Sequence, residues 1–325
     1  MLTIRGRNVN DILPVGILHL TGGEQRQSRN GPVLEIPTPV SVRYDCPDER
    51  VLFEPKRDAN PFFHLFESLW MLAGRNDVAF LDQYNSRMKQ YSDDGQGFNA
   101  AYGQRLRSGF GFDQIEECIQ RLRKDPDDRR IVLQIWDPAD MLKQTVDMAC
   151  NLVITPRVRK GCLDWTVFNR SNDYLFGLTG ANAVHLSVIH EYVARMSGIL
   201  LGSYEQITNC CHAYVETPVW QATKDLPLSV NDPYNNGVVK PFPLISERNV
   251  WNSDLVRWME DPKGNRTYTD PFFEHVAKPM AITHYEHKVN RNGLKYVGLI
   301  SASDWRKACT EWLERRECDT SVQGG

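Results

Sequence analysis

The residues of this chain that could do covalent chemistry lie close together in the sequence. Cys150 opens an apolar run. It is followed by polar residues of the types that bind nucleotides, namely Arg170, Ser171, Asp173, Asn182, His212 and Tyr214. A thiol attacks as the thiolate, which nearby positive charge favours. Arginine and serine are phosphate ligands, and an asparagine amide can read a planar amide edge. This stretch therefore predicts a cysteine that attacks the base of a nucleotide whose phosphate is bound nearby.

The composition is that of a folded chain without a strong charge. The 325 residues are 41% hydrophobic and 10% aromatic, and the net charge of −3 argues against duplex nucleic acid as a partner. No stretch approaches the roughly 20 apolar residues of a membrane helix, and no signal-peptide core follows the N-terminus. The eight cysteines include no C-x-x-C pair, and His212 beside Cys210 and Cys211 offers too few ligands for zinc. We therefore expect reduced thiols and no bound metal.

Hydrophobic periodicity and turn signals predict the elements that would position these groups. Asn60–Pro61 should begin a helix that ends near Gly74. Further helices are expected at 114–124, 182–196 and 303–317, the last followed by a polar tail. Strands are expected at 131–136, 152–158 and 163–168, the last two joined around 160–161. Residues 1–40 are typical of short strands and turns, and 270–282 of extended chain. The mixture indicates an α+β fold.

Several of these residues also have a plainer interpretation. Glu67 lies within the first predicted helix, where it is either solvated or held in an apolar pocket for proton transfer. Solvation is the commoner outcome for a glutamate. Arg129–Arg130 and Arg170–Ser171, each taken alone, are typical of loop or strand-end pairs. His185 and His190 on the long helix are expected to be structural.

Four segments together resemble the thymidylate synthase family of pyrimidine C5-modifying enzymes, which includes the deoxynucleotide (dUMP or dCMP) hydroxymethylases. The segments are residues 66–74, 101–103, 125–133 and 150–214. Residues 276–282 also resemble the C-terminal peptide of that family. The resemblance extends over roughly residues 20 to 282. It implies a mixed β-sheet backed by helices and a homodimer formed through the sheet.

Carried over residue by residue, the resemblance implies a role for each matching position. Cys150 would attack C6 of the pyrimidine, and Glu67 would manage protons and ordered water. The residues implied to bind the 5′-phosphate are Arg29, Arg170 and Ser171, joined by Arg129 and Arg130 of the second subunit. Asn182 would read the O4/N3 edge of the base. The remaining implied contacts are His212 and Tyr214 with the deoxyribose 3′-hydroxyl, and Asp173 and Tyr102 with the folate.

The implied chemistry explains why these residue types are needed. C5 of uracil is a poor nucleophile, and a thiolate added at C6 turns it into an enolate carbon. That carbon can attack the methylene of 5,10-methylenetetrahydrofolate. After tetrahydrofolate leaves, an exocyclic methylene remains at C5. Hydride from the folate then gives a methyl group, whereas water gives a hydroxymethyl group.

Three departures from the synthase pattern favour water. Synthases carry tryptophans that shield the intermediate, whereas residues 86–94 contain none. Asn151 stands where synthases have a histidine, and the chain continues beyond Ile282, where the synthase C-terminus closes over the folate. In addition, residues 177–182 contain one residue more than the synthase pattern. Asparagine rather than aspartate at position 182 favours uracil over cytosine.

The sequence therefore predicts a folate-dependent deoxyuridylate hydroxymethylase acting through a Cys150–C6 adduct. A thymidylate synthase with a diverged folate cover, a dCMP or CMP hydroxymethylase, and a non-catalytic nucleotide- or RNA-binding protein are the alternatives. We expect a catalytic domain over residues 1–282 and a C-terminal extension over 283–325. The expected location is the cytoplasm of a bacterium or of a virus-infected cell, with neither a membrane nor a nucleic-acid partner.

Overall fold

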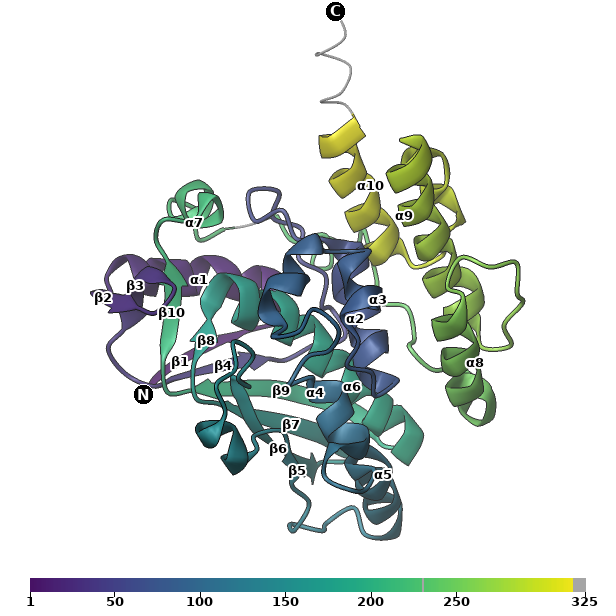
Figure 1. Cartoon of the computed structure of the whole chain (residues 1–325), viewed down its shortest axis with the longest axis horizontal. Coiled ribbons are helices and arrows are strands. Elements are labelled where there is room, and N and C mark those ends of the chain that lie inside the picture. Colours follow the sequence, from purple (N-terminus) through teal and green to yellow (C-terminus); the bar gives the residue numbers. More distant parts are fainter. Residues whose placement is uncertain (230, 318–325) are drawn as a thin grey trace, which may run out of the picture.

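A six-stranded mixed β-sheet forms the centre of the computed structural model, which describes residues 1–229 and 231–317 (Figure 1). Its strand order is β1 (Leu2–Gly6), β4 (Val40–Tyr44), β9 (Leu200–Thr208), β7 (Cys162–Asn169), β6 (Asn151–Arg159) and β5 (Leu133–Gln134). The pairs β1–β4 and β7–β9 are parallel, and the other neighbours are antiparallel. The predicted α+β class is thus confirmed.

A second, four-stranded sheet lies beside the first (Figure 1). Its order is β2 (Glu24–Ser28), β3 (Gly31–Ile36), β10 (Cys211–Tyr214) and β8 (Asn172–Asp173). The chain enters it directly from the large sheet, because β8 follows β7 and β10 follows β9 after only two residues each. The two sheets therefore meet at residues 170–171 and 209–210.

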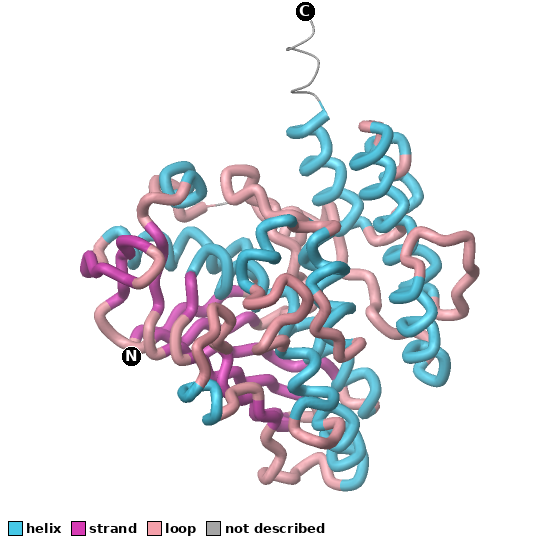
Figure 2. The backbone as a smooth tube through the Cα atoms, in the orientation of Figure 1, coloured by secondary structure: helices cyan, strands magenta, loops and turns pink. Residues whose placement is uncertain are grey.

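Most of the helices lie above the strands and to their right in Figure 2. They are α1 (Val9–Thr21), α2 (Pro61–Leu72), α3 (Val78–Asp82), α4 (Tyr102–Gln104), α5 (Gln114–Lys124), α6 (Asn182–Ser197), α7 (Pro218–Thr223), α8 (Arg248–Glu260), α9 (Lys278–Asn290) and α10 (Ser303–Glu317). The 3₁₀ and π segments are η1 (Ser86–Tyr91), η2 (Arg105–Gly109), η3 (Pro138–Leu142), η4 (Tyr174–Ala181), η5 (Phe273–Ala277), η6 (Gly293–Lys295) and η7 (Val297–Leu299). None of the helices within the described ranges is long and apolar enough to cross a membrane.

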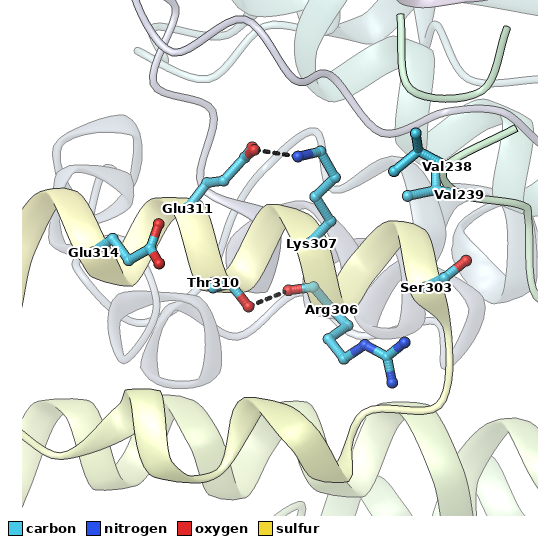
Figure 3. Close-up of a pocket in the computed structure, with 8 residues that line it drawn as sticks. All are labelled: Val238, Val239, Ser303, Arg306, Lys307, Thr310, Glu311 and Glu314. Carbon is cyan, nitrogen blue, oxygen red and sulfur yellow. Dashed lines mark hydrogen bonds and ion pairs between the residues drawn. The ribbon is translucent and has the colours of Figure 1, made fainter. Parts of the chain in front are cut away.

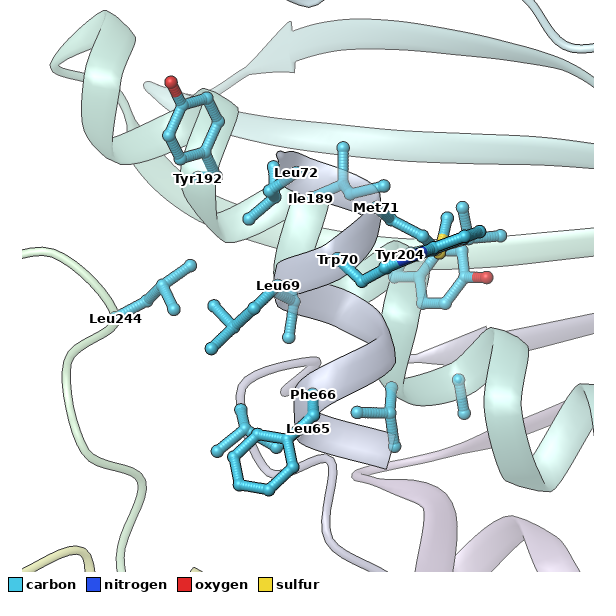
Figure 4. Close-up of a cluster of buried hydrophobic side chains, with 14 of the residues drawn as sticks. Leu65, Phe66, Leu69, Trp70, Met71, Leu72, Ile189, Tyr192, Tyr204 and Leu244 are labelled. Carbon is cyan, nitrogen blue, oxygen red and sulfur yellow. The ribbon is translucent and has the colours of Figure 1, made fainter. Parts of the chain in front are cut away.

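The helix α2 forms where the sequence predicts it. The Asn60 side chain accepts a hydrogen bond from the Phe63 N–H at 3.1 Å, and Pro61 occupies the first helical turn. Gly74, just past the end, has a φ of 68°, which glycine adopts without strain. The apolar face of α2 packs on α6, as the buried cluster of Figure 4 shows for Leu69 and Ile189.

The helix α6 also begins at the predicted residue, and η4 precedes it. The φ and ψ of Gly180, −124° and −116°, interrupt the helical path inside η4. A π-helical turn contains one residue more than an α-helical turn in the same rise. The π conformation of η4 can therefore accommodate the additional residue of 177–182, so that Asn182 still opens α6.

The C-terminal helices pack on the back of α2. The ring centroids of Phe62 and Trp312 of α10 lie 5.6 Å apart, and those of Phe66 and Trp258 of α8 lie 5.2 Å apart. Arg315 Nε also donates to Asp58 Oδ1 at 3.1 Å, just before α2 begins. The helix that carries Glu67 is thus held between the core of the large sheet and the C-terminal helices.

Three sequence-based predictions are wrong in detail. Residues 1–40 contain the helix α1, whose buried Ile12, Leu13 and Ile17 follow helical spacing although Pro14 lies among them. The strand expected at 131–136 is limited to β5. Residues 270–282 are helical rather than extended, because Phe273, Val276, Ala277, Met280 and Ala281 are spaced to bury one helical face.

The other predicted elements are confirmed. The helix at 114–124, the strands at 152–158 and 163–168 and the helix at 303–317 all form. Lys160 and Gly161, with φ of 52° and 78°, make the tight turn between β6 and β7. The polar tail expected after α10 lies outside the described residues.

Candidate active site

Cys150 immediately precedes β6 at the junction of the two sheets. Its backbone N–H donates to the Tyr102 hydroxyl at 3.2 Å, and its carbonyl accepts from the Arg170 N–H at 3.0 Å. Tyr102 can reach this position because α4 packs tightly on α2. A Cβ at Gly103 would lie only 2.2 Å from the Met71 carbonyl oxygen, so this approach requires glycine. The structure therefore joins Tyr102, Cys150 and Arg170.

The guanidinium of Arg170 contacts both the backbone just before Cys150 and the Cys150 sulfur. Its Nε donates to the Ala149 carbonyl at 2.8 Å, and its Nη2 lies 3.6 Å from Cys150 Sγ. Burial nevertheless raises the pKa of the Cys150 thiol, and Asp147 and Asp173 add to the rise, which Arg170 only partly offsets. The expected electrostatic activation by arginine is thus present in direction, but it does not make the resting thiol acidic.

The residues predicted to bind phosphate and sugar lie on or beside the small sheet. Arg29 occupies the exposed turn between β2 and β3, where Asn30 Nδ2 lies 3.5 Å from the Tyr214 hydroxyl. His212 and Tyr214 are two residues apart on β10, so their side chains share a face, with ring centroids 5.2 Å apart. His212 Nδ1 lies 3.5 Å from Ser171 Oγ. The fold thus gathers donors from three distant sequence segments.

Arg129 and Arg130 are not brought to Cys150 within the described part of this chain. Both are exposed in the loop after α5, and the Arg130 side chain is 80% accessible. Its Nε donates to Asp128 Oδ1 at 2.9 Å, which fixes the loop rather than a ligand.

Four asparagines and a glutamine form a buried chain of hydrogen bonds beside the nucleophile. Asn169 Nδ2 donates to Asn151 Oδ1, whose own Nδ2 donates to Asn182 Oδ1 at 3.3 Å. Asn182 Nδ2 donates to Asn172 Oδ1 at 3.1 Å, and Asn172 Nδ2 donates to Gln206 Oε1 at 3.1 Å. Every amide in the chain therefore donates in the same direction.

The far end of this amide chain fixes its direction. Gln206 Nε2 donates to the Leu178 carbonyl oxygen at 3.2 Å and contacts the Tyr44 hydroxyl at 3.1 Å. A carbonyl can only accept, so Gln206 must present its amino group there and its oxygen to Asn172. By the same logic Asn182 keeps its oxygen toward Asn151. One lone pair and one N–H of Asn182 remain for a ligand.

Glu67 projects from α2 toward α6, where it meets His185. Glu67 Oε2 and His185 Nε2 lie 3.1 Å apart, within ion-pair distance. Burial raises the pKa of Glu67 to about 8 and lowers the pKa of His185 to about 3. The plainer expectation of a solvated Glu67 is therefore wrong, because this carboxyl lies in an apolar environment and is protonated at neutral pH.

Asp173 and its surroundings suit a flat heterocycle such as the folate pteridine. Its Oδ1 caps η4 by accepting from the N–H groups of Leu175 and Phe176, both at 2.8 Å. Phe176, 38% exposed, supplies one of these N–H groups, and the Arg57 guanidinium lies over its ring, 4.6 Å from the ring centroid. An aromatic face next to a carboxylate offers stacking and a hydrogen-bond acceptor. The residues present therefore fit the implied co-substrate.

The segment 86–94, in which synthases have tryptophans, offers little cover here. η1 buries none of its residues, and Tyr91 is 47% exposed. Asp93 at the end of this segment instead accepts hydrogen bonds from Thr145 and Val146, in the loop before Cys150. The segment is thus tied to the nucleophile's loop without forming an apolar cover.

A surface groove runs along α10, away from these residues (Figure 3). It is lined by Val238, Val239, Ser303, Arg306, Lys307, Thr310, Glu311 and Glu314. No predicted site residue lines it, so it is separate from the candidate active site. Among the described residues, no group of His, Cys, Asp and Glu side chains is arranged to hold a metal ion.

Comparison with known proteins gives the family. The model of the thymidylate synthase family matches residues 17–231, well over half of the chain. The chain belongs to the thymidylate synthase family. The resemblance recognised in its sequence segments is thus confirmed.

Individual relatives within the thymidylate synthase family differ in name. A deoxyuridylate hydroxymethyltransferase of Pseudomonas phage M6 is 43% identical over 97% of this chain and 95% of its own length. A deoxyuridylate hydroxymethyltransferase of Bacillus phage SP01 is 41% identical over 58% of this chain and 52% of its own. A thymidylate synthase of Corynebacterium aurimucosum is 27% identical over 54% of this chain and 66% of its own length.

Sequence reasoning gave no role to several residues that contact the predicted site residues. Asn151 was noted only as a departure from the synthase pattern, and the contact of His185 with Glu67 was not anticipated. Asn169, Asn172 and Gln206 had no predicted role. The signal available was that Asn169 and Asn172 flank Arg170–Ser171 in one polar run. Their connection to Asn182 depends on strand register, which the sequence does not display.

The contact of Arg170 with Cys150 predicts an effect on thiol reactivity. Arg170→Lys cannot reproduce the donor geometry that reaches both a carbonyl and Sγ. The Cys150 pKa should rise further, and alkylation at about pH 8 should slow by at least about threefold, the effect of half a pKa unit. Peptide mass spectrometry after iodoacetamide treatment measures the rate. Half-exposed Cys162 is the internal control, and equal or faster labelling of Cys150 would contradict the assignment.

Burial of Glu67 predicts a pH-dependent cost to stability. Between its ordinary value of 4.5 and its folded value of about 8, the folded state holds a proton that the unfolded chain has released. This contribution therefore falls as pH rises, by about 1.4 kcal/mol per pH unit. Glu67→Gln should gain free energy of unfolding relative to wild type by up to about 2 kcal/mol between about pH 5.5 and 7.5. Chemical denaturation at both values checks this, with exposed Glu314→Gln as control, and a constant difference would contradict it.

Proposed function

We propose that this protein is a folate-dependent deoxyuridylate hydroxymethylase. It converts dUMP, 5,10-methylenetetrahydrofolate and water into 5-hydroxymethyl-dUMP and tetrahydrofolate. The observation that carries the proposal is the 43% identity, over 97% of the chain, to a phage protein named deoxyuridylate hydroxymethyltransferase. The family uses 5,10-methylenetetrahydrofolate as its one-carbon donor, and the surroundings of Asp173 fit such a co-substrate.

In the proposed mechanism, each group of site residues contacts one part of the two substrates. Cys150 adds to C6 of the uracil ring, with the backbone around it held by Tyr102 and Arg170. Arg29, Arg170 and Ser171 face the 5′-phosphate with cationic and hydroxyl donors. The proposed sugar contacts are His212 and Tyr214, and the proposed folate contacts are Asp173 and Tyr102. Because the Cys150 thiol is neutral at rest, its proton must leave as the nucleotide is engaged.

The direction of the amide chain supports uracil as the base. Uracil presents an N3–H donor next to the O4 acceptor, whereas cytosine presents the reverse pattern. The remaining lone pair and N–H of Asn182 match uracil. Cytosine would require Asn182 to flip, which would set its oxygen against the oxygen of Asn172. The alternative of a cytidylate hydroxymethylase is therefore the less favoured one.

Water rather than hydride is the proposed final partner of the exocyclic methylene. Exposed η1 provides no tryptophan cover. A thymidylate synthase, which makes a methyl group and dihydrofolate, remains the second candidate, because other relatives carry that name.

The proposed assembly is a homodimer formed through the large sheet, in which Arg129 and Arg130 of each subunit complete the phosphate site of the other. Their exposure in this chain supports that arrangement. We propose residues 1–282 as the catalytic domain and 283–325 as a C-terminal extension, of which α10 packs on α2. The phage origin of the relatives supports action in the cytoplasm of a bacterium or infected cell, with neither membrane nor nucleic acid as partner.

The product identifies the reaction. Wild-type protein incubated with dUMP and 5,10-methylenetetrahydrofolate should give 5-hydroxymethyl-dUMP by mass spectrometry, without the absorbance rise of dihydrofolate. Cys150→Ser should lower turnover by at least about a thousandfold, whereas Cys162→Ser should not. A methyl product with dihydrofolate would support the synthase instead. Turnover of dCMP or CMP but not dUMP would contradict the uracil assignment, and no turnover would contradict catalysis.

The amide chain predicts how base selection can be weakened. Asn172→Ala removes the acceptor that holds Asn182 Nδ2 and breaks the connection to Gln206. The ratio of kcat/KM for dUMP to that for dCMP should fall by about tenfold, the value of one hydrogen bond of about 1.4 kcal/mol. Exposed Asn290→Ala is the matched control. An equal loss of kcat/KM for both nucleotides would show that the chain stabilises the fold without selecting the base.

A further inference from the structure

The contact between Glu67 and His185 gives His185 surroundings that a purely structural histidine does not have. His185 Nε2 and Glu67 Oε2 lie 3.1 Å apart, with side-chain exposures of 5% and 14%. Both atoms are buried, and neither has a hydrogen-bond partner in the described residues, so each is the nearest polar group that the other could bond. His190 on the same helix differs, because its Nε2 contacts the Leu163 carbonyl at 2.6 Å and its ring stacks on Trp165.

The pair lies next to the base-reading amide. His185 follows Asn182 by three residues on α6, so both side chains lie on one face of the helix, about one turn apart. Asn182 also accepts a hydrogen bond from Asn151, the residue that follows Cys150 in the chain. Glu67 Oε1 differs from Oε2, because it makes no hydrogen bond in the described residues and is not fully buried. One carboxyl oxygen thus lies against His185, and the other is accessible to a ligand or water.

We propose that His185 is a positioning residue for the water step, accepting a hydrogen bond from Glu67 Oε2 so that Oε1 is held to orient the attacking water. This inference rests on the proposed hydroxymethylase function and deepens it. The pKa values agree with this role, since burial keeps Glu67 protonated and His185 neutral at neutral pH. The Glu67 carboxyl can then donate a hydrogen bond from Oε2, and Nε2 has a lone pair to accept it.

The proposed step balances in atoms and electrons. The water oxygen attacks the exocyclic methylene carbon at C5, and the π pair of that double bond moves into the C4 enolate. The water proton moves to the C4 enolate oxygen, while Glu67 Oε1 holds the water by a hydrogen bond and His185 stays neutral. The resulting enol then gives up this proton, re-forms the C4 carbonyl, creates the C5–C6 double bond and expels the Cys150 thiolate from C6, and the thiolate takes up the proton. No oxidant or reductant is required.

Two measurements on one reaction separate this step from the earlier ones. Formation of the exocyclic methylene removes the C5 hydrogen, so tritium release from [5-³H]dUMP reports the steps before water attacks. The yield of 5-hydroxymethyl-dUMP reports the water step. The assay uses full-length protein with 5,10-methylenetetrahydrofolate. Its variants are His185→Leu, which removes the acceptor, His185→Gln, which keeps an amide oxygen, and His190→Gln as matched control.

His185→Leu should release tritium within about threefold of the wild-type rate, but form at least about tenfold less product per tritium released. Intact-mass measurement should show a covalent adduct accumulating on Cys150. His185→Gln should recover most of the product yield, and His190→Gln should match wild type. If the Leu variant melts below the assay temperature, His185→Ala takes its place, and His185→Gln still has to retain the yield.

A wild-type product yield per tritium in the Leu or Ala variant would overturn the role of His185 while leaving the proposed function intact. So would a parallel loss of tritium release and product, because that outcome indicates a general structural role. Absence of tritium release and of product in the wild type would instead overturn the proposed function itself.

Discussion

The carbonyl of Leu178 sets the direction of the hydrogen bonds that reach the candidate base-reading residue. Because this oxygen can only accept, Gln206 must turn its amino group toward it, and each amide back to Asn169 follows. Leu178 lies inside η4, two residues before the interruption at Gly180. The local π conformation therefore influences two features, namely the residue at which α6 begins and the orientation of the Asn182 amide. The links from Asn151 to Gln206 can therefore be made in only one direction, although Asn169 Oδ1 at the start of the chain is buried without a hydrogen-bond partner among the described residues.

Burial determines the protonation states around the nucleophile. The pKa values of Cys150, Glu67 and Asp173 are all raised, with burial as the first cause in each case. The Cys150 thiol and the Glu67 carboxyl consequently hold their protons in the resting site. Such a site suits chemistry in which a thiol proton leaves and later returns, since proton transfers occur between neighbouring groups rather than with bulk water. The packing of Trp312 and Trp258 on α2 contributes by keeping water away from the helix that carries Glu67.

The sequence predicted those elements whose signals are local. Asn60–Pro61 marks the start of α2, and Lys160–Gly161 marks the turn between β6 and β7. Proline normally ends or kinks a helix, yet α1 contains Pro14 with its apolar face packed on the core, and Pro279 is tolerated because it lies in the first turn of α9. The amide chain was beyond prediction, because its members come from β6, β7, β8, α6 and β9. Its existence depends on strand register, including the pairing of Asn151 with Asn169.

The C-terminal part of the chain bears on how the folate side of the site can close. Residues 276–282 resemble the synthase peptide that closes over the folate, but here they lie at the junction of η5 and α9. Val276, Ala277 and Met280 have no accessible surface, so releasing them as a lid would expose a large part of the core. The helices that follow continue to α10, which is bound to Asp58 by Arg315 and Arg316. With this segment fixed in the core and η1 exposed, two covers that exclude water in synthases are absent from the described residues. That combination supports water rather than hydride as the partner of the methylene intermediate.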